Sequence, residues 1–357
     1  MFGTLQTLDD LQTNAQTIAQ FGEEALADRV RQALEIHNRA MQEAVADFAV
    51  VTGDALLPYG VGDDMEMQEL DQNGSPDVQK TTAGGNLGLP LRFYGIAVQW
   101  NRHFILNTSV GELLRRMDAA AAADVRNLTR QIRRALLTPT NNLSYFDILQ
   151  TQLTLPLRAL LNADGQAIPM GPNGESFTAG SHTHYNAEAS LSEAGLTAVL
   201  DDVVEHGVTG GMAIYIARAQ EAAVRAFAGF EPYVDARINT GANDSFATGN
   251  LDVNNPADRA IGVFNGAEIS VKPWVPANYQ IAFDRGAGTD KALGIRTRSG
   301  ALGGDAYGGG FGTLYEADGF PLRARALGRE FGVGVVGRHK AAVNYSGGAS
   351  YTAPTIA

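Results

Sequence analysis

The sequence predicts an α+β fold in which a few long helices and a largely separate set of strands share one chain. Two segments, 26–48 and 110–137, carry apolar residues at the helical spacings of three and four. Strand-like runs lie elsewhere, first at Leu91–Leu106 and last at Leu322–Val343. Between the first helix and the first strand, residues 54–95 show no helical period. A loop of this length in a compact domain is usually functional or disordered.

The composition narrows the class of protein. The 357 residues are enough for one large domain or two smaller lobes, and 45% hydrophobic with 18% charged residues indicates a globular chain. There is no cysteine, which excludes disulfides, thiolate metal sites and cysteine nucleophiles. No apolar run approaches the roughly 18 residues that span a bilayer, and the N-terminus lacks the regions of a secretory signal. We therefore expect a cytoplasm-like compartment and no membrane partner.

The N-terminal fifty residues are predicted to be helical. One apolar face recurs along them, formed by Leu26, Val30, Leu34, His37, Met41, Val45 and Phe48. Because only this stripe is apolar, the helix must lie against its own subunit or against a neighbour. His37 lies on the stripe, which favours a packed histidine over a functional one.

The segment 40–79 is strongly acidic. It contains no Lys or Arg, and its nine acids are Glu43, Asp47, Asp54, Asp63, Asp64, Glu66, Glu69, Asp71 and Asp77. Short extended candidates at Met65–Leu70 and Val78–Thr82 alternate with Gly-rich breaks, which suggests a long protruding hairpin. The whole chain has a net charge of −12, and so concentrated a negative segment requires a basic surface elsewhere.

The clearest helix is predicted at 110–137. Ser109 and Glu112 have the spacing of a capping box, and Thr138-Pro139 ends the helix. Its apolar stripe is Leu114, Met117, Ala121, Val125, Leu128, Ile132 and Ala135. The other faces carry six arginines: Arg115, Arg116, Arg126, Arg130, Arg133 and Arg134. These faces form the basic surface that the acidic segment requires.

The second half of the chain alternates between short helices and strands. A helix is expected at 192–206, from Ser192 to the stop at Gly207, and another at 217–228. The expected strands are Met212–Ile216, Ile261–Phe264, Ile269–Val271, Tyr279–Phe283 and one long strand at Leu322–Val343. In the long strand, Gly332, Gly334 and Gly337 mark twist or close backbone approach. Residues 239–256 and 299–312 are predicted to be loops.

The sequence contains one closely spaced histidine pair that could form a metal site. His182 and His184 would share one face of a strand and could ligate a metal, with Glu188 as a conceivable third ligand. A polar turn is the favoured interpretation of this segment, and we therefore expect no metal site. If a metal were bound, His182 and His184 would be its candidate ligands. No nucleophile elbow, phosphate-binding loop or EF-hand pattern occurs. We expect no catalytic residues, no cofactor and no enzyme.

In order and spacing, five stretches resemble the major capsid proteins of tailed bacteriophages, which have the Hong Kong 97-like fold. They are Leu91–Trp100 (LRFYGIAVQW), Ala123–Thr138 (ADVRNLTRQIRRALLT), Pro172–Tyr185 (PNGESFTAGSHTHY), Glu268–Pro276 (EISVKPWVP) and Leu322–Val343 (LRARALGREFGVGVVGRHKAAV). The resemblance covers about residues 50–345. It implies an N-terminal arm at 1–53, an extended E-loop region at 54–110, a P domain at 111–184 and 313–346 whose spine helix is 110–137, an A domain at 185–312 and a C-terminal tail at 347–357.

The resemblance also implies a function. Such a subunit self-assembles into the hexamers and pentamers of an icosahedral shell that encloses the double-stranded DNA of a tailed phage (class Caudoviricetes). The expected location is the virion, after assembly in the host cytoplasm. The interface is expected to pair Asp63, Asp64, Glu66, Glu69 and Asp71 with Arg115, Arg116, Arg126, Arg130, Arg133 and Arg134.

Further partners follow from the same resemblance. Separate scaffolding and portal proteins are expected, with decoration proteins as an open possibility. The negative net charge predicts only weak, non-specific contact with the packaged DNA. Some relatives join subunits through a Lys–Asn isopeptide bond, for which Lys80 and Asn344 are candidates here; a solvated lysine is the favoured interpretation.

Two rival functions stay open at this point. An encapsulin, a bacterial compartment with the same fold, would hold a protein cargo instead of DNA. A metal-dependent enzyme centred on His182 and His184 would contain stoichiometric metal. Fold alone does not decide between a virion and a compartment.

Overall fold

The computed structural model describes most of the chain. The described residues are 16–59, 65, 67–70, 72, 74–79, 84–101, 106–161, 163–208, 210–239, 246–248, 258–286, 290–319 and 322–356. The helices are α2 (Ile18–Phe21), α3 (Glu23–Val45), α5 (Val110–Leu137), α6 (Glu193–Val204) and α7 (Glu221–Arg225), with a 3₁₀ turn η1 (Arg218–Gln220). None of the described helices has both the length and the hydropathy that crossing a bilayer would take.

Most strands belong to two sheets. The first has the order β1 (Ala49–Thr52), β15 (Leu293–Arg296), β17 (Leu322–Val335) and β16 (Gly312–Gly319), and β4 (Arg92–Asn101) also pairs with β17. The second has the order β7 (Tyr185–Ala187), β18 (Ala341–Tyr345), β14 (Tyr279–Asp284), β8 (Met212–Ile216), β13 (Ala267–Val271), β12 (Arg259–Phe264) and β9 (Phe230–Pro232). Three hairpins stand apart: β2 (Leu56–Tyr59) with β3 (Gly85–Gly88), β5 (Asn142–Phe146) with β6 (Thr154–Leu157), and β10 (Val234–Asn239) with β11 (Phe246–Thr248).

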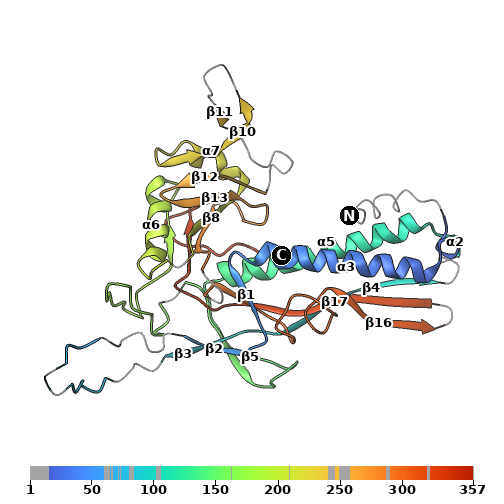
Figure 1. The fold of residues 1–357 in the computed structure, drawn as a ribbon, viewed down its shortest axis with the longest axis horizontal. Coiled ribbons are helices and arrows are strands. Elements are labelled where there is room, and N and C mark those ends of the chain that lie inside the picture. The colour runs from blue at the N-terminus through green and yellow to red at the C-terminus, as the bar shows by residue number, and fades with distance from the viewer. Residues whose placement is uncertain are drawn as a thin grey trace.

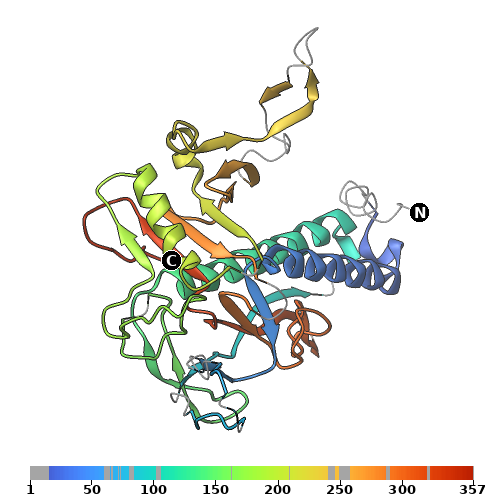
Figure 2. The same ribbon diagram turned by 60° about the vertical axis from the view of Figure 1, so that its left-hand side comes forward.

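These elements form an elongated arm and a second lobe. In Figure 1, α3 and α5 lie side by side along the arm, with β4, β16 and β17 beneath them. The seven-stranded sheet and α6 form the lobe at the upper left, from which the β10–β11 hairpin projects. The β2–β3 hairpin leaves the body at the lower left, and the turned view in Figure 2 shows the same separation of arm and lobe. The molecule therefore presents several projections rather than one rounded surface.

The spine helix has the predicted bounds. The Ser109 hydroxyl accepts a hydrogen bond from the backbone N–H of Glu112 at 3.3 Å, which satisfies an otherwise unpaired donor of the first turn. The Glu112 carboxylate does not complete a capping box; it pairs instead with Arg115 and Arg116. The apolar stripe of α5 is buried at Leu114, Met117, Leu128 and Ile132.

The N-terminal helix docks on its own subunit. Ile18, Leu26 and Val30 are buried in one cluster with Leu114 and Leu327, which joins α2 and α3 to α5 and β17. His37 is packed as predicted: its Nε2 lies 2.9 Å from Asp124 Oδ2 and its ring contacts Phe311 at 5.5 Å. Of the two docking alternatives, the structure shows the one within the chain.

The predicted single strand at Leu322–Val343 is wrong. Strand β17 ends at Val335, the chain turns, and β18 joins the other sheet by pairing with β14 and β7. Strand propensity continues through Gly337 to Lys340, but Gly337 and Lys340 close a turn through a backbone hydrogen bond of 2.9 Å. The two sheets are thus joined directly by consecutive strands.

Other elements differ in detail from the prediction. The strand at Leu91–Leu106 is β4, and the helix expected at 217–228 is the short pair η1 and α7. The hairpin within 54–95 is confirmed at its base, where Leu56 pairs with Gly88 and Tyr59 with Gly85. The described parts of Met65–Leu70 and Val78–Thr82 contain no strand, so those extended candidates are wrong over these parts.

The two main sheets combine strands from different predicted domain ranges. Strand β15, within 185–312, pairs with β17 in the arm, and β18, within 313–346, lies between β7 and β14 in the sheet of the lobe. The division into N-terminal arm, E-loop, P domain and A domain stays a prediction. The boundaries would follow the sheets more closely if β15 were assigned to the P domain and β18 to the A domain.

The glycine at position 332 is required by a close backbone approach. A Cβ there would lie 2.1 Å from the carbonyl oxygen of Pro90, so Gly332→Ala must displace backbone. We expect this variant to lose about 1–3 kcal/mol of unfolding free energy, as overpacked cores do. Thermal denaturation measures it against Gly303→Ala, where a Cβ would meet no atom within 4 Å. Equal melting temperatures for the two variants would contradict this packing.

Candidate functional site

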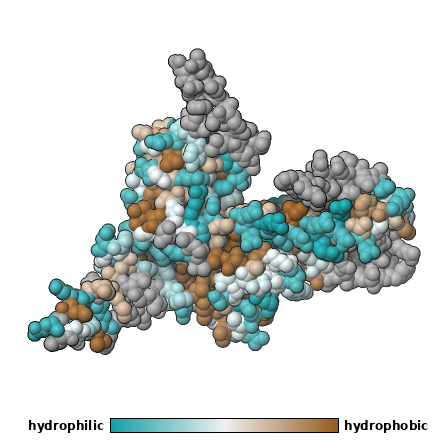
Figure 3. Space-filling view, viewed as in Figure 1, coloured by the Kyte–Doolittle hydropathy of each residue, from teal (hydrophilic) through white to brown (hydrophobic). Residues whose placement is uncertain are grey.

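Two hairpins expose apolar side chains to solvent. The first, here called the acidic arm, comprises the described residues between 56 and 88; its exposed side chains are Leu56, Met65, Met67, Leu70 and Val78. The second, the apolar hairpin, comprises residues 142–157; its exposed side chains are Leu143, Phe146, Ile148 and Leu153. Figure 3 shows hydrophobic residues on the projection at the lower left. Clustered exposed apolar side chains of this kind mark surfaces that a partner covers.

The predicted acidic interface residues fall mostly outside the described residues. Asp63, Asp64, Glu66 and Asp71 lie there, and Glu69 is described as exposed on the acidic arm. Their pairing with a neighbouring spine helix stays a prediction.

The six spine arginines divide into two groups. Arg115 and Arg116 pair with Glu112 of their own helix at 2.8 and 3.3 Å, and Arg134 bonds Gln131 at 3.5 Å. The middle three line a groove of about 620 Å³, whose walls include Arg126, Arg130, Arg133, Phe48, Met41 and Trp274. A groove that combines cationic and aromatic walls suits an acidic segment with apolar residues, which is the composition of the acidic arm.

A buried ion pair fastens the apolar hairpin to the body. Arg296 on β15 and Asp147 at the end of β5 lie 2.9 Å apart, and both side chains are 0% exposed. Arg296 also donates to the Leu89 carbonyl at 2.8 Å and to Gln150 Oε1 at 2.5 Å. Burial alone would raise the pKa of Asp147, but hydrogen bonds from Thr151 and Arg296 hold it below its usual range. The exposed apolar hairpin is therefore attached to the body through a fully buried ion pair.

A second carboxylate connects three segments of the body. Asp164 accepts hydrogen bonds from Asn141 at 2.8 Å, Arg158 at 3.0 Å and Arg338 at 3.0 Å. Asn141 precedes β5, and Arg338 lies in the turn between β17 and β18. Burial opposes ionisation, yet the bonds from Arg338, Asn141 and Arg158 lower the pKa of Asp164 to about 2.

The low pKa of the Asp164 carboxyl predicts that the free energy of unfolding decreases at acid pH. This decrease is here called the acid limb of the stability curve. The pKa of Asp164 is about 2 in the folded chain and about 3.9 in an unfolded one, so its contribution of about 2 kcal/mol is complete above pH 5. The contribution disappears as the pH falls from about 5 toward 2, because the folded state must then take up a proton that the unfolded state already holds. We expect Asp164→Asn to flatten this limb in chemical denaturation. Glu35→Gln, an exposed carboxylate on α3, should leave the limb intact.

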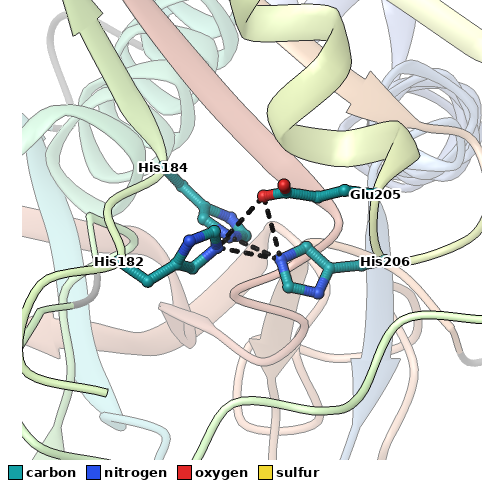
Figure 4. Close-up of side chains that lie close together, drawn as sticks. All are labelled: His182, His184, Glu205 and His206. Atoms are coloured by element: carbon teal, nitrogen blue, oxygen red, sulfur yellow. Dashed lines mark hydrogen bonds and ion pairs between the residues drawn. The ribbon is translucent and has the colours of Figure 1, made fainter. Parts of the chain in front are cut away.

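The predicted histidine pair belongs to a larger cluster, drawn in Figure 4. His182 Nε2 lies 3.0 Å from His184 Nε2 and 3.1 Å from His206 Nε2, and the last two atoms are 3.0 Å apart. Glu205 Oε1 lies 3.2 Å from His182 Nε2 and 3.7 Å from His206 Nε2. His184 and His206 are buried, while the Glu205 side chain is 35% exposed. The four side chains therefore converge on one point.

The three rings favour the neutral state. Desolvation, together with the neighbouring rings of His339 and His182, lowers the pKa of His206 to about 3. Burial likewise lowers the pKa of His184 well below its usual value and lowers that of His182. Burial raises the pKa of Glu205, and the negative charges of Asp201 and Glu175 raise it as well. Neutral imidazole is the form that ligates metals.

The path of the chain explains why these residues meet. His182 and His184 enter β7, the chain turns at Ser192, and α6 runs back across the sheet to end at Glu205 and His206. Sequence reasoning found the pair through its i, i+2 spacing but missed His206 and Glu205. The prediction of Glu188 as a conceivable third ligand is wrong. Its carboxylate lies outside the histidine cluster and accepts hydrogen bonds from Ser192 and Asn344.

The structure describes only one of the two cross-linking candidates, Lys80 and Asn344. Lys80 lies outside the described residues. Asn344 is fully buried in β18, where its amide donates to Glu188 at 2.8 Å and to Gln280 at 2.6 Å and its oxygen accepts from Asn186 at 2.8 Å. The isopeptide bond stays a prediction.

Comparison with solved structures identifies the fold. A structure from Mycobacterium phage Patience matches with a TM-score of 0.64 at 19% sequence identity, covering 92% of this chain and 90% of that chain. A structure from Gordonia phage Cozz gives 0.45 at 11% identity, with 85% of each chain covered. The holo-SrpI encapsulin complex from Synechococcus elongatus PCC 7942 gives 0.42 at 8% identity, covering 86% of this chain and 88% of that chain.

No protein-family model and no curated protein matches the chain. The agreement with the phage Patience structure over nine tenths of both chains shows the Hong Kong 97-like α+β fold. The predicted fold class is confirmed.

Proposed function

We propose that this chain is the major capsid protein of a tailed bacteriophage, a structural subunit without enzymatic activity that self-assembles into the hexamers and pentamers of an icosahedral shell. The observation that carries the proposal is the pair of projecting hairpins with exposed apolar side chains on a Hong Kong 97-like body. Phe146 is 54% exposed, Ile148 69% and Met67 101%, at positions where a lone subunit gains nothing from an apolar residue.

The two surfaces suit assembly into rings and closed shells. Neighbours in a ring meet through two different patches of the same sequence, so each subunit needs complementary rather than identical surfaces. The acidic arm and the arginine-lined groove on α5 have opposite charge and are two different patches of the same subunit. We assign the acidic arm to the groove of an adjacent subunit and the apolar hairpin to contacts between capsomers.

Further partners belong to the same proposal. Separate scaffolding and portal proteins would direct assembly in the host cytoplasm, and the double-stranded DNA would be held inside the virion mainly by confinement. The net charge of −12 opposes tight DNA binding, since phosphate neutralisation requires Lys and Arg.

Microscopy of the recombinant protein and of the native particle tests the proposal. Negative staining should show closed icosahedral shells or ring-shaped capsomers, and native particles should protect DNA from nuclease. Shells that hold protein cargo and no DNA would support an encapsulin instead. A chain that stays a monomer or dimer under every assembly condition would overturn the shell function altogether.

A further inference from the structure

The geometry points to a metal site: we infer that His182, His184, Glu205 and His206 bind one divalent transition-metal ion, with Zn²⁺ as the expected occupant. The ion would fasten the segment entering β7 to the C-terminal end of α6. This inference is independent of the proposed shell function, because it concerns contacts within one subunit.

The distances between the four ligand atoms fit one ion. Four ligands at about 2.0–2.1 Å from a tetrahedral Zn²⁺ lie about 3.3 Å from one another. The three Nε2 atoms are separated by 3.0–3.1 Å, and Glu205 Oε1 is 3.2 Å from the nearest of them. All four atoms lie within 4.8 Å of one another. An ion at their centre needs only small side-chain adjustments.

The hydrogen positions favour a cation over a hydrogen-bonded cluster. His184 Nδ1 lies 3.2 Å from the Ala341 carbonyl oxygen, which can only accept, so Nδ1 carries the proton. The neutral ring therefore directs the Nε2 lone pair at the cluster. Each ring N–H has one direction, and three nitrogens at mutual hydrogen-bond distance cannot all be satisfied by donating to one another. A central cation satisfies all three lone pairs at once.

The fourth ligand supplies independent support. Glu205 Oε1 is buried, yet it makes no hydrogen bond of acceptable geometry with any described residue, although it lies beside two imidazoles. A carboxylate oxygen without a donor is costly in a protein interior. Direct coordination to an ion at the cluster centre would compensate it, and its negative charge would offset part of the ion's charge.

The surroundings are those of a structural site. The Ala341 carbonyl orients His184 from the outer shell, as second-shell acceptors do in metal centres. The Phe177 ring covers His182 and His206 at centroid distances of 4.6 and 4.3 Å. Four protein ligands close a tetrahedral shell and leave no position for substrate. In a chain without cysteine, such an ion would take the place of a covalent cross-link.

Metal analysis of untagged protein tests the site directly. Protein purified without a polyhistidine tag should contain about one zinc ion per subunit by mass spectrometry. Removing the ion with a chelator should lower the melting temperature, on the order of 5 °C, and adding Zn²⁺ should restore it. Replacement by Co²⁺ should give the visible absorption of a four-coordinate site.

A pair of variants on the same helix end gives the matched control. Glu205→Gln removes a ligand charge while keeping the side-chain volume, and we expect it to weaken zinc binding at least about tenfold. Asp201→Asn makes the same charge change one turn earlier, outside the ligand set, and should bind zinc as the parent does. His182→Ala with His206→Ala should abolish binding, and its melting temperature should no longer respond to the chelator.

Three results would overturn the inference, and any one suffices: no stoichiometric metal in the untagged protein, a melting temperature indifferent to both chelator and Zn²⁺, or equal zinc affinity in Glu205→Gln and Asp201→Asn. If the double histidine variant does not fold, the chelator experiment on the parent still decides. Microscopy of the same samples separates this outcome from a failure of the shell function.

Discussion

Replacing both Phe146 and Ile148 by Asp is expected to abolish shell assembly while leaving the subunit folded. Both side chains are more than half exposed on the apolar hairpin, so the isolated chain loses little stability. In an assembled shell each would lose about 1.5–3 kcal/mol of apolar burial and add a charge to a desolvated contact. Because the contact repeats at every subunit, even part of this loss prevents closure. Light scattering and electron microscopy measure assembly, and circular dichroism measures folding.

Conservative changes at the same two positions provide the control. Phe146→Leu with Ile148→Val keeps the hairpin apolar and should assemble like the parent. Closed shells from the double Asp variant would show that the apolar hairpin faces solvent in the particle. The exposed side chains would then need another explanation, such as a decoration protein.

Removing the buried guanidinium of Arg296 is expected to be the most destabilising single change. Arg296→Ala leaves the Asp147 carboxylate fully buried without its cation, which costs about 3–5 kcal/mol in comparable buried pairs. It also removes the donors to the Leu89 carbonyl and to Gln150. The free energy of unfolding from chemical denaturation measures the loss.

Two further variants separate charge from packing at this anchor. Arg296→Met combined with Asp147→Asn leaves no buried charge, so part of the lost stability should return. Arg115→Ala removes an arginine that is 61% exposed and should have little effect. A small effect of Arg296→Ala, equal to that of Arg115→Ala, would mean that water reaches the Asp147 carboxylate.

The sequence predicts the elements whose signals are local. The spine helix has its own cap at Ser109, a continuous apolar stripe and a terminating Thr138-Pro139, so its bounds at 110–137 agree with the structure. Strand β8 is likewise predicted at Met212–Ile216, because a short apolar run lies between turn residues. Where such boundary signals are weak, the prediction fails: β1 (Ala49–Thr52) follows α3 closely, and the predicted helical segment of fifty residues includes the first two residues of β1.

The failures at larger scale concern pairing rather than propensity. The residues of β17 and β18 have similar strand character, and nothing local in Leu322–Val343 tells that they belong to different sheets. The histidine cluster has the same origin. His206 and Glu205 reach His182 only because α6 runs back along the sheet, which is a property of the topology. The buried pair of Arg296 and Asp147 joins residues 149 positions apart and has no sequence signature.

The direct passage from β17 to β18 has a mechanical consequence for a pressurised shell. Strand β17 is 14 residues long and is flanked by β4 and by β15 and β16, whereas β18 lies between β7 and β14. A force that pulls the lobe away from the arm would run along β17 and load its flanking ladders in shear, so that many backbone hydrogen bonds resist together instead of opening one by one. In the proposed DNA-filled shell, internal pressure would be carried through this strand, and the turn at 336–340, fixed by Arg338 on Asp164, would be the point at which the load changes direction.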